Sequence, residues 1–314
     1  MIFNELEEEA YKKKLESVIE ETEGFYNHWY ADHLGYATIG FGTAIEYTNN
    51  GKMSNEKVKE MFKNVGKVID DRTIEMARNL GKGIHDKSGN FTITKEQGVD
   101  LMYLEINTKR ESIKKRLLKV YSELKQTSEE IALLSISYNT GSLGSSLSNA
   151  VNNKERVKAW FEIRYRYNGG KSRGQGLANR RYIESDTFQL FDNVYFDAKD
   201  PLINKDGKIN KEKQEKITTE EREEIMNFLN SKDDKGKIRK KIAEEYELEM
   251  PPQKSVKNHK SIGFDEIWKF LNNTVEKPVI GNRTKEAENL KQRYGGVVVV
   301  KGNKSTDENE EYNG

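Results

Sequence analysis

The apolar pattern of this chain changes from helical to strand-like at Gly24, and this change restricts the N-terminal region to a mixed fold. On the preceding segment, one face follows the spacing i, i+3, i+4, i+7 through Leu15, Val18, Ile19 and Thr22. Gly24 stands where a left-handed C-terminal cap would end a helix, so Glu23 is expected in the last turn. Residues 25–41 are aromatic and β-branched except at 32–35, which predicts two short strands joined by a turn.

Helices are expected along most of the segment that follows. One is predicted near 54–80, and Thr94 with Gln97 forms a capping-box signature that opens a long amphipathic helix through about 118. The most apolar helix begins at Ser128 and ends at 139–141. Together these elements predict an α+β, mostly helical fold with a small antiparallel sheet. The 94–118 helix is expected to connect a small lobe to a helical lobe that ends near 192.

The character of the sequence changes after about position 195. A length of 314 residues exceeds the usual size of one domain, and residues 200–314 are highly charged, with few aliphatic residues for a core. We therefore expect a domain at 1–195 and a C-terminal extension at 196–314, with a disordered tail after about 301. Short helices are predicted at 219–230, 237–249, 264–273 and 284–294, and the valines after 295–296 form a possible edge strand.

Composition excludes several classes of site. The chain has 53 lysine and arginine residues against 52 aspartate and glutamate residues, so its net charge gives no reason to expect a nucleic acid partner. The absence of cysteine excludes disulfides, zinc thiolate sites and cysteine nucleophiles. The first residues lack the apolar core of a signal peptide, and no apolar stretch approaches the roughly 18 residues of a membrane span. We expect a soluble product without a signal peptide or transmembrane segment.

Glu23, Asp32 and Thr38 are candidates for the hydrolysis of a glycosidic bond. This reaction needs one protonated carboxyl to donate to the leaving oxygen and one ionised carboxylate on the opposite face of the sugar. The negative end of a helix dipole disfavours the anion of Glu23, whereas Asp32 on a wet turn should stay ionised. Thr38 on the returning strand supplies a hydroxyl that can hold a water against Asp32.

The segment EGFYNHWYADHLGYATIGFGT, from Glu23 to Thr43, resembles the catalytic segment of phage-type lysozymes and endolysins, glycoside hydrolase family 24. That family has the pattern Glu-Gly, Tyr-x-Asp, Gly, Thr-Ile-Gly-x-Gly-His. The resemblance implies that Glu23 is the general acid, Asp32 the base or water-orienting carboxylate, and Thr38 the water-placing hydroxyl. Tyr30, Gly40 and Gly42 fall on the supporting positions of the pattern. Thr43 replaces the family histidine, which is read as a structural ion-pair member, so this departure affects local stability.

A second region continues the resemblance in the family's order. Residues 137–141, including Asn139, resemble its Phe-Asn-x-Gly segment. Residues 169–184 resemble its Gly-Gly-Lys, Gly-Leu, Arg-Arg, Glu segment and contain Asn179 and Arg180, of which the latter is expected near Glu23. The resemblance covers about 11–192 and implies a two-lobed lysozyme fold.

The implied function is a muramidase that cleaves the β-1,4 bond between N-acetylmuramic acid and N-acetylglucosamine in peptidoglycan with inversion, without a cofactor. Three roles remain open: an endolysin or virion-borne lysozyme, a muramidase toxin, or a structural virion protein that retains the fold. The extension at 196–314 is expected to bind the envelope, the virion or an immunity protein. An endolysin would be made in the host cytoplasm and then released to the wall. Nine basic residues against three acidic ones at 151–185 form either a surface toward an anionic envelope or a solvated helix face.

Other motifs give weaker indications. Residues 169–172 resemble part of a phosphate loop but lack the first glycine, which is Tyr165 here. Residues 204–209 resemble the middle of a calcium loop whose end carboxylates are missing. His28 and His33 flank the candidate site without other ligands at metal-binding spacing, so no metal is expected. The aromatic residues Trp29, Tyr30, Tyr36 and Phe41 either cover the sheet or stack against sugars.

Overall fold

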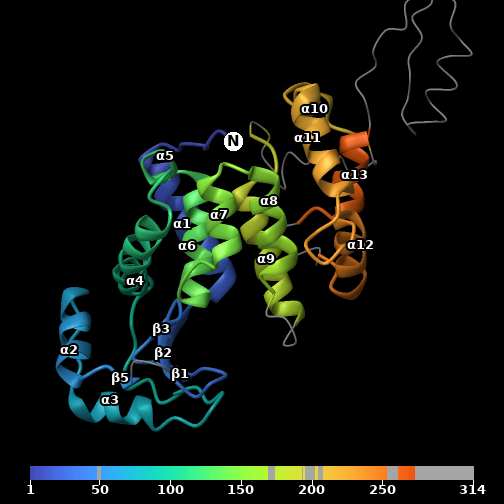
Figure 1. Ribbon diagram of the computed structural model, residues 1–314. Coiled ribbons are helices and arrows are strands. Elements are labelled where there is room, and N and C mark those ends of the chain that lie inside the picture. The colour runs from blue at the N-terminus through green and yellow to red at the C-terminus, as the bar shows by residue number, and fades with distance from the viewer. Residues whose placement is uncertain are drawn as a thin grey trace, which may run out of the picture. The chain divides into compact units, whose positions relative to one another are not determined.

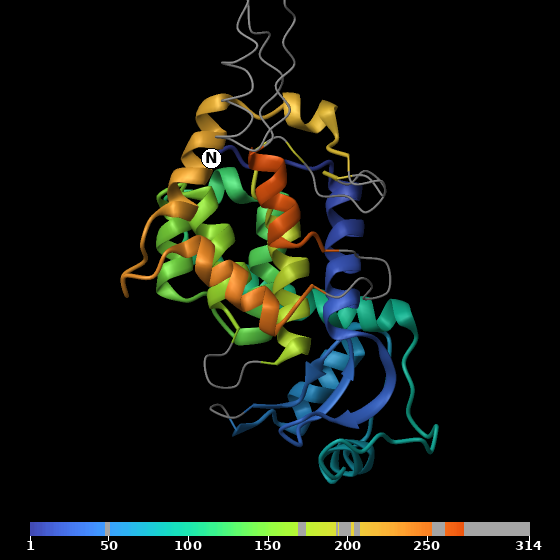
Figure 2. The same cartoon turned by 90° about the vertical axis from the view of Figure 1, so that its right-hand side faces the viewer.

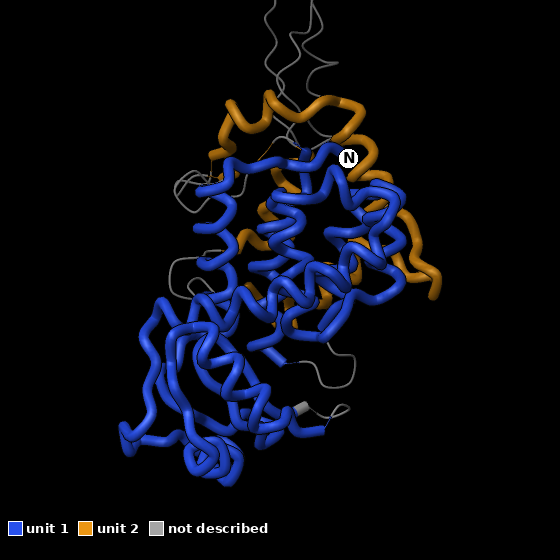
Figure 3. The backbone as a smooth tube through the Cα atoms, turned by 90° about the vertical axis from the view of Figure 1, so that its left-hand side faces the viewer, with its two compact units in different colours: residues 1–192 blue, residues 193–314 orange. Residues whose placement is uncertain are grey.

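The computed structural model describes residues 1–47, 51–168, 174–192, 194, 202–203, 208–252 and 261–272 (Figure 1). The chain divides into two compact units, Met1–Asp192 and Asn193–Gly314, which Figure 3 distinguishes by colour. Among the described residues, no helix combines the length and the apolar character that a membrane span requires.

Unit 1 begins with helix α1 (Glu8–Glu23), which buries the predicted apolar face and ends at Gly24. Gly24 has φ 73° and ψ 177°, so it is a positive-φ residue but lacks the left-handed helical geometry expected there. An antiparallel sheet follows, in the order β1 (Tyr26–Ala31), β2 (Ala37–Gly40), β3 (Thr43–Ala44). Strands β4 (Glu46–Tyr47) and β5 (Gly51–Lys52) form a separate pair.

The segment predicted as one helix near 54–80 forms two helices instead. Helix α2 (Asn55–Asn64) is capped by Ser54, and α3 (Asp71–Arg78) is capped by Asp70. Gly66, between them, has φ 71°, which a continuous right-handed helix cannot contain. Both helices pack into the core of the small lobe, where Trp29 contacts Phe62 with ring centroids 5.6 Å apart.

Helix α4 (Lys95–Arg116) carries the predicted capping box at Thr94 and Gln97 and connects the two lobes of unit 1 (Figure 1). The helical lobe then comprises α5 (Tyr121–Leu124), α6 (Ser128–Thr140), α7 (Ser145–Asn152), α8 (Arg156–Phe161), the π-helical η1 (Glu162–Arg166) and α9 (Gln175–Phe188). Helix α6 is buried over most of its length and contacts α1, α4 and α9. The sheet lies at one end of unit 1, away from the helical lobe (Figure 2).

Unit 2 contains α10 (Lys211–Glu215), α11 (Thr219–Asn230), α12 (Arg239–Glu249) and α13 (Phe264–Asn272) among its described residues. The last three agree closely with the predicted helices, and α12 contacts both α11 and α13. The helix expected at 284–294, the strand after 295–296 and the tail after 301 lie outside the described residues. The prediction of an α+β, mostly helical fold with a small antiparallel sheet is confirmed.

Candidate active site

Glu23 is the last residue of α1, where the helix stops at Gly24. Its side chain is 20% exposed, and its Oε1 accepts a hydrogen bond from Nη1 of Arg180 at 2.5 Å. Arg180 belongs to α9, so this contact joins the end of the first helix to the last helix of unit 1. The expectation that Arg180 lies near Glu23 agrees with this geometry.

Asp32 occupies the turn that joins β1 to β2. Its Oδ1 accepts hydrogen bonds from the backbone N–H groups of Leu34 and Tyr36, both at 2.8 Å. Its own N–H donates to the carbonyl oxygen of Tyr36 at 3.0 Å. These contacts fix the direction of the carboxylate and satisfy one of its oxygens.

Thr38 lies on β2 directly opposite Tyr30 of β1, and it is only 3% exposed. Its hydroxyl donates to the carbonyl oxygen of Tyr36 at 2.9 Å, the same oxygen that accepts the N–H of Asp32. The hydroxyl proton of Thr38 is therefore used in a hydrogen bond to the backbone. The lone pairs of the hydroxyl oxygen can still accept a hydrogen bond from a water molecule.

Tyr30 lies on β1 two residues before Asp32 and opposite Thr38 of β2. Burial raises the pKa of Tyr30, and the charges of Glu23, Tyr26 and Asp32 raise it further. Both candidate acids therefore act electrostatically on this tyrosine, although they come from a helix end and a turn.

Gly42 allows the backbone to approach the carboxyl group of Glu23 closely. Its φ is +92°, and a Cβ at this position would lie 3.3 Å from Oε2 of Glu23. Gly40 also has a positive φ of +70°, and a Cβ there would contact Ile93 at 3.4 Å. Gly42 therefore shapes the site, whereas Gly40 allows the sheet to pack against the start of α4.

Arg180 is held in place by several partners besides Glu23. Its Nε donates to Oε1 of Glu184 at 2.9 Å, and its Nη2 donates to the carbonyl oxygen of Ser135 at 2.8 Å. Burial acts to lower the pKa of Arg180, but the charges of Glu184 and Glu23 outweigh it and raise this pKa. The arginine is a permanent cation whose charge is shared between the two carboxylates.

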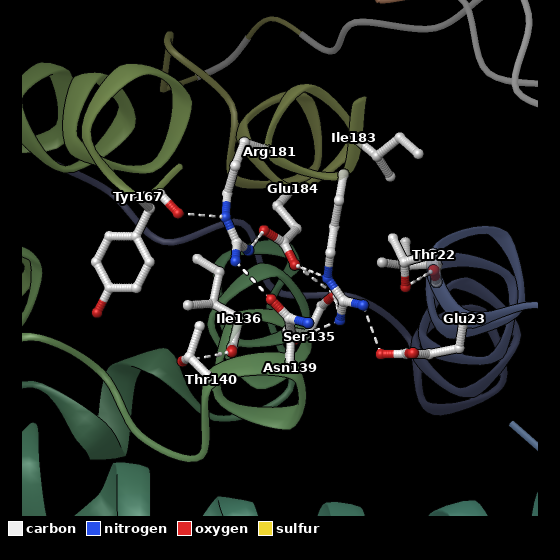
Figure 4. A network of polar contacts seen from close by, with 12 residues as sticks. Thr22, Glu23, Ser135, Ile136, Asn139, Thr140, Tyr167, Arg181, Ile183 and Glu184 are labelled. Atoms are coloured by element: carbon white, nitrogen blue, oxygen red, sulfur yellow. Dashed lines mark hydrogen bonds and ion pairs between the residues drawn. The ribbon is translucent and has the colours of Figure 1, made fainter. Parts of the chain in front are cut away.

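Arg181 extends the same network toward the exposed end of α6. It pairs with Oε2 of Glu184, and neither side chain is exposed to solvent. Its Nη2 also donates to Oδ1 of Asn139 at 2.7 Å (Figure 4). Because Oδ1 of Asn139 is engaged in this way, the amide group presents its N–H donors in the remaining directions.

A cleft of about 830 Å³ opens beside these residues, between the small lobe and helices α4 and α6. Asp32, Gly42 and Asn139 are among its lining residues. Glu23, Tyr30 and Thr38 do not line it, although Glu23 lies directly behind Gly42. The volume lies within the usual range for small-molecule sites and fits a short carbohydrate segment.

Sequence reasoning did not identify Glu105 as a site residue. This carboxylate lies on α4, lines the cleft and pairs with Lys109 at 3.4 Å. Burial raises the pKa of Glu105, Lys109 opposes this effect, and the charge of Glu23 adds to it. The signal was present in the sequence, since Glu105 stands four residues after Leu101 on the apolar face of a predicted helix.

The remaining predicted residues lie farther from the cleft or have local roles. Asn179 accepts a hydrogen bond from Gln175 one turn earlier on α9 and does not line the cleft. Thr43, which replaces the family histidine, is buried and lines the cleft.

Four arginines of the basic segment 151–185 are buried and do not contribute to the surface toward the envelope that the sequence allowed. Arg156 pairs with Glu129 at 2.5 Å, Arg164 pairs with Asp186 at 3.0 Å, and both arginines are buried. Arg180 and Arg181 are buried as well. These arginines form internal ion pairs, because a buried guanidinium group is stable only beside an opposite charge.

No group of three or more histidine, aspartate or glutamate side chains suited to a metal ion occurs among the described residues. Nε2 of His28 lies 3.2 Å from Nδ1 of His85, and His33 is exposed. The candidate phosphate loop at 169–172 and most of the candidate calcium loop lie outside the described residues.

A family model described as phage lysozyme matches residues 20–184, just over half of the chain. The matched range includes both candidate acids, Thr38 and Arg180. Among solved structures, the endolysin from Escherichia coli O157:H7 phage FAHEc1 is similar, with 23% identity over 59% of this chain and 95% of that chain and a TM-score of 0.39. No curated protein matches the chain.

Proposed function

Since this chain belongs to the phage lysozyme family, and is thus a peptidoglycan hydrolase, we propose that it is a muramidase. The bond cleaved is the β-1,4 linkage between N-acetylmuramic acid and N-acetylglucosamine. The observation that carries this proposal is that Asp32 lines a cleft of about 830 Å³, while the carboxyl group of Glu23 lies directly behind Gly42 in the lining of the same cleft. Two carboxylates flanking a groove are the machinery that glycoside hydrolysis requires.

Glu23 acts as the general acid. In the substrate complex it carries a proton and donates it to the glycosidic oxygen as the bond to the anomeric carbon breaks. In the free protein, Arg180 donates a hydrogen bond to Oε1 of Glu23. Glu184 also accepts from Arg180, so the positive charge of the arginine is shared between two carboxylates. Gly42 lets the scissile bond come close to Oε2 because no side chain intervenes.

Asp32 acts as the base that orients the attacking water. Its Oδ1 is held by two backbone N–H groups, which leaves Oδ2 to accept a proton from water. Thr38 assists through its hydroxyl oxygen, since the hydroxyl proton is donated to Tyr36. Attack by water on the face opposite the leaving oxygen gives inversion at the anomeric carbon.

Zymography on purified peptidoglycan tests the proposal with three variants of the full chain. Wild type should clear the gel, whereas Glu23→Gln and Asp32→Asn should not, with melting temperatures close to that of wild type. Glu9→Gln changes an exposed glutamate in the first turn of the same helix and serves as the matched control. A wild-type protein that clears nothing would mean that the fold is retained as a scaffold.

The products distinguish the proposed reaction from other ways of cutting the same polymer. Borohydride reduction should convert a new muramic acid end to its alcohol, whereas a glucosaminidase would give reduced glucosamine. Mass spectrometry should show hydrated ends rather than anhydro ends, and proton NMR of early products should show the inverted anomer. A glucosaminitol or anhydro product would refute the muramidase assignment.

We further propose that residues 1–195 form the catalytic domain and that 196–314 bind the envelope, the virion or a protein partner. The protein would be made in the host cytoplasm and would then reach the wall, as an endolysin does. Limited proteolysis of the full chain checks the boundary. A resistant fragment ending near 195 supports it, and a full-length resistant band contradicts it.

A further inference from the structure

Four aromatic rings gather beside β1 and form what we call the β1 ring cluster: Tyr26, His28, Tyr30 and His85. The centroids of Tyr26 and Tyr30 are 4.6 Å apart, and His85 lies 5.1 Å from Tyr26 and 5.4 Å from Tyr30. The His85 and Tyr30 rings are nearly parallel, with an interplanar angle of 17°. His28 joins the cluster through His85, with centroids 5.4 Å apart.

Three of these rings stand at alternate positions of β1, whose pairing with β2 is irregular between Tyr26 and Tyr30. Tyr26 is exposed and positions 28 and 30 are partly exposed, whereas Trp29 and Ala31 are buried. The fourth ring, that of His85, comes from the loop after α3, whose backbone bonds to β1. Asp86 donates its N–H to the carbonyl oxygen of Trp29 at 2.8 Å, which sets His85 in a bridge opposite Tyr30.

The core does not require these rings. Trp29 already fills the buried side of β1, and Tyr26 is 37% exposed. A partly exposed group of adjacent aromatic rings is a surface suited to binding as well as to packing. Phenol hydroxyls and imidazole nitrogens at the edges of the rings can also donate and accept hydrogen bonds.

The cluster adjoins the segments that carry the candidate acids. Tyr30 lies two residues before Asp32 and opposite Thr38, and the Tyr26 ring lies 4.0 Å from the position of a Cβ on Gly24, the residue after Glu23. None of the four cluster residues lines the 830 Å³ cleft, which lies beside Gly42 and α4. The cluster is therefore close to both acid-bearing segments but outside the cleft.

We propose that the β1 ring cluster is a saccharide subsite, which holds sugars of the glycan chain that extend beyond the cleft. The proposal rests on the proposed function and deepens it. An enzyme that cuts within a glycan chain must accommodate sugars on both sides of the bond. The apolar face of a pyranose packs against an aromatic ring, and its hydroxyl groups bond to polar edges such as those of Tyr26 and His85.

Binding of peptide-free glycan strands to the full chain tests the subsite. Glu23→Gln serves as the background, so that the strands stay intact during calorimetry. Adding Tyr26→Ala or His85→Ala should weaken binding about tenfold, the effect of losing one aromatic contact. Tyr26→Phe keeps the ring and should bind within about twofold of the background. Leu118→Ala, at an exposed site on another part of unit 1, controls for unspecific effects.

The outcomes separate this inference from the proposed function. If wild type cleaves peptidoglycan but Tyr26→Ala and Tyr26→Phe bind glycan equally well, the subsite is wrong and the muramidase assignment stands. If the two alanine variants lose affinity only for isolated stem peptides, the occupant is peptide and the inference is overturned. If wild type cleaves nothing but the glycan affinity still depends on the ring at position 26, the proposed function fails and the subsite survives. Melting temperatures equal to that of the background show that each variant is folded.

Discussion

Arg180 and Glu23 lie 157 positions apart in the sequence and form a 2.5 Å hydrogen bond between Nη1 and Oε1. This contact fixes the end of α1 against α9. It also links the candidate acid to a network of two arginines and Glu184, which continues to Asn139 at the cleft. The position of the acid therefore depends on the packing of the whole helical lobe.

Arg180→Lys should lower kcat about tenfold or more, although the charge is retained. The planar guanidinium makes separate contacts with Glu23, Glu184 and the carbonyl of Ser135, and an ammonium group cannot reproduce this fork. Steady-state assays on soluble peptidoglycan fragments measure the effect. Arg72→Lys, at an exposed position of α3, is the control. Equal kcat values in the two variants would show that only the charge matters.

Glu184→Gln should lower the free energy of unfolding by about 3 kcal/mol, because it leaves a buried arginine without its counter-charge. Glu184 and Arg181 are both inaccessible to solvent, and Glu184 also binds Arg180. Urea denaturation followed by circular dichroism gives the value. The same measurement on Glu9→Gln should differ from wild type by less than about 0.5 kcal/mol. A similarly small loss in Glu184→Gln would contradict the structural role of the network.

Gly42→Ala should reduce activity at least about tenfold through displacement of the Glu23 carboxyl group. The added Cβ would lie 3.3 Å from Oε2, at a φ of +92°. Gly66→Ala provides a matched control, since φ there is +71° but no atom lies within 4 Å. Both variants should lose roughly 1–2 kcal/mol of stability from the strained backbone, and only the first should lose activity. Comparable rates for the two variants would remove Gly42 from the site.

Glu105→Gln should change the pH dependence of stability. Burial raises the pKa of Glu105 above its ordinary value of 4.5, so the folded protein holds this proton more tightly than the unfolded chain does. The stabilising contribution is fully present below the unfolded value and is lost as pH rises through the folded value. Glutamine stays neutral throughout, so the unfolding free energy of the variant should increase relative to wild type as pH rises above the ordinary value of 4.5. Urea titrations at several pH values measure this difference in unfolding free energy. A decrease of the variant relative to wild type as pH rises would contradict the predicted sign.

The local elements could be predicted because their signals are local. The end of α1 follows from Gly24, and the start of α4 follows from the capping box of Thr94 and Gln97. The segment 54–80 was predicted less well, because the spacing of its apolar residues does not show that the helix is interrupted at Gly66. A single positive-φ residue and a new N-cap at Asp70 were enough to divide the helix.

Burial of charge could not be predicted in the same way. Arg156 and Arg164 belong to a basic segment that composition alone allows to be a surface. Their carboxylate partners, Glu129 and Asp186, stand 27 and 22 positions away and are brought near only by helix packing. The sequence did place Glu105 on the apolar face of a predicted helix, but its position in the cleft follows only from the packing of α4.

The sequence alone predicted several of the helices and strands, the residue types of the candidate acids and hydroxyl, and the glycines at their turns. These properties depend on residue type and on short-range spacing, which the chain carries before it folds. Three features required the packed fold: Arg180 pairs with Glu23, four arginines of the segment 151–185 form buried ion pairs, and the β1 ring cluster adjoins the candidate acids. Desolvation and Coulomb interactions depend on distances through space, and those distances exist only after the lobes have packed.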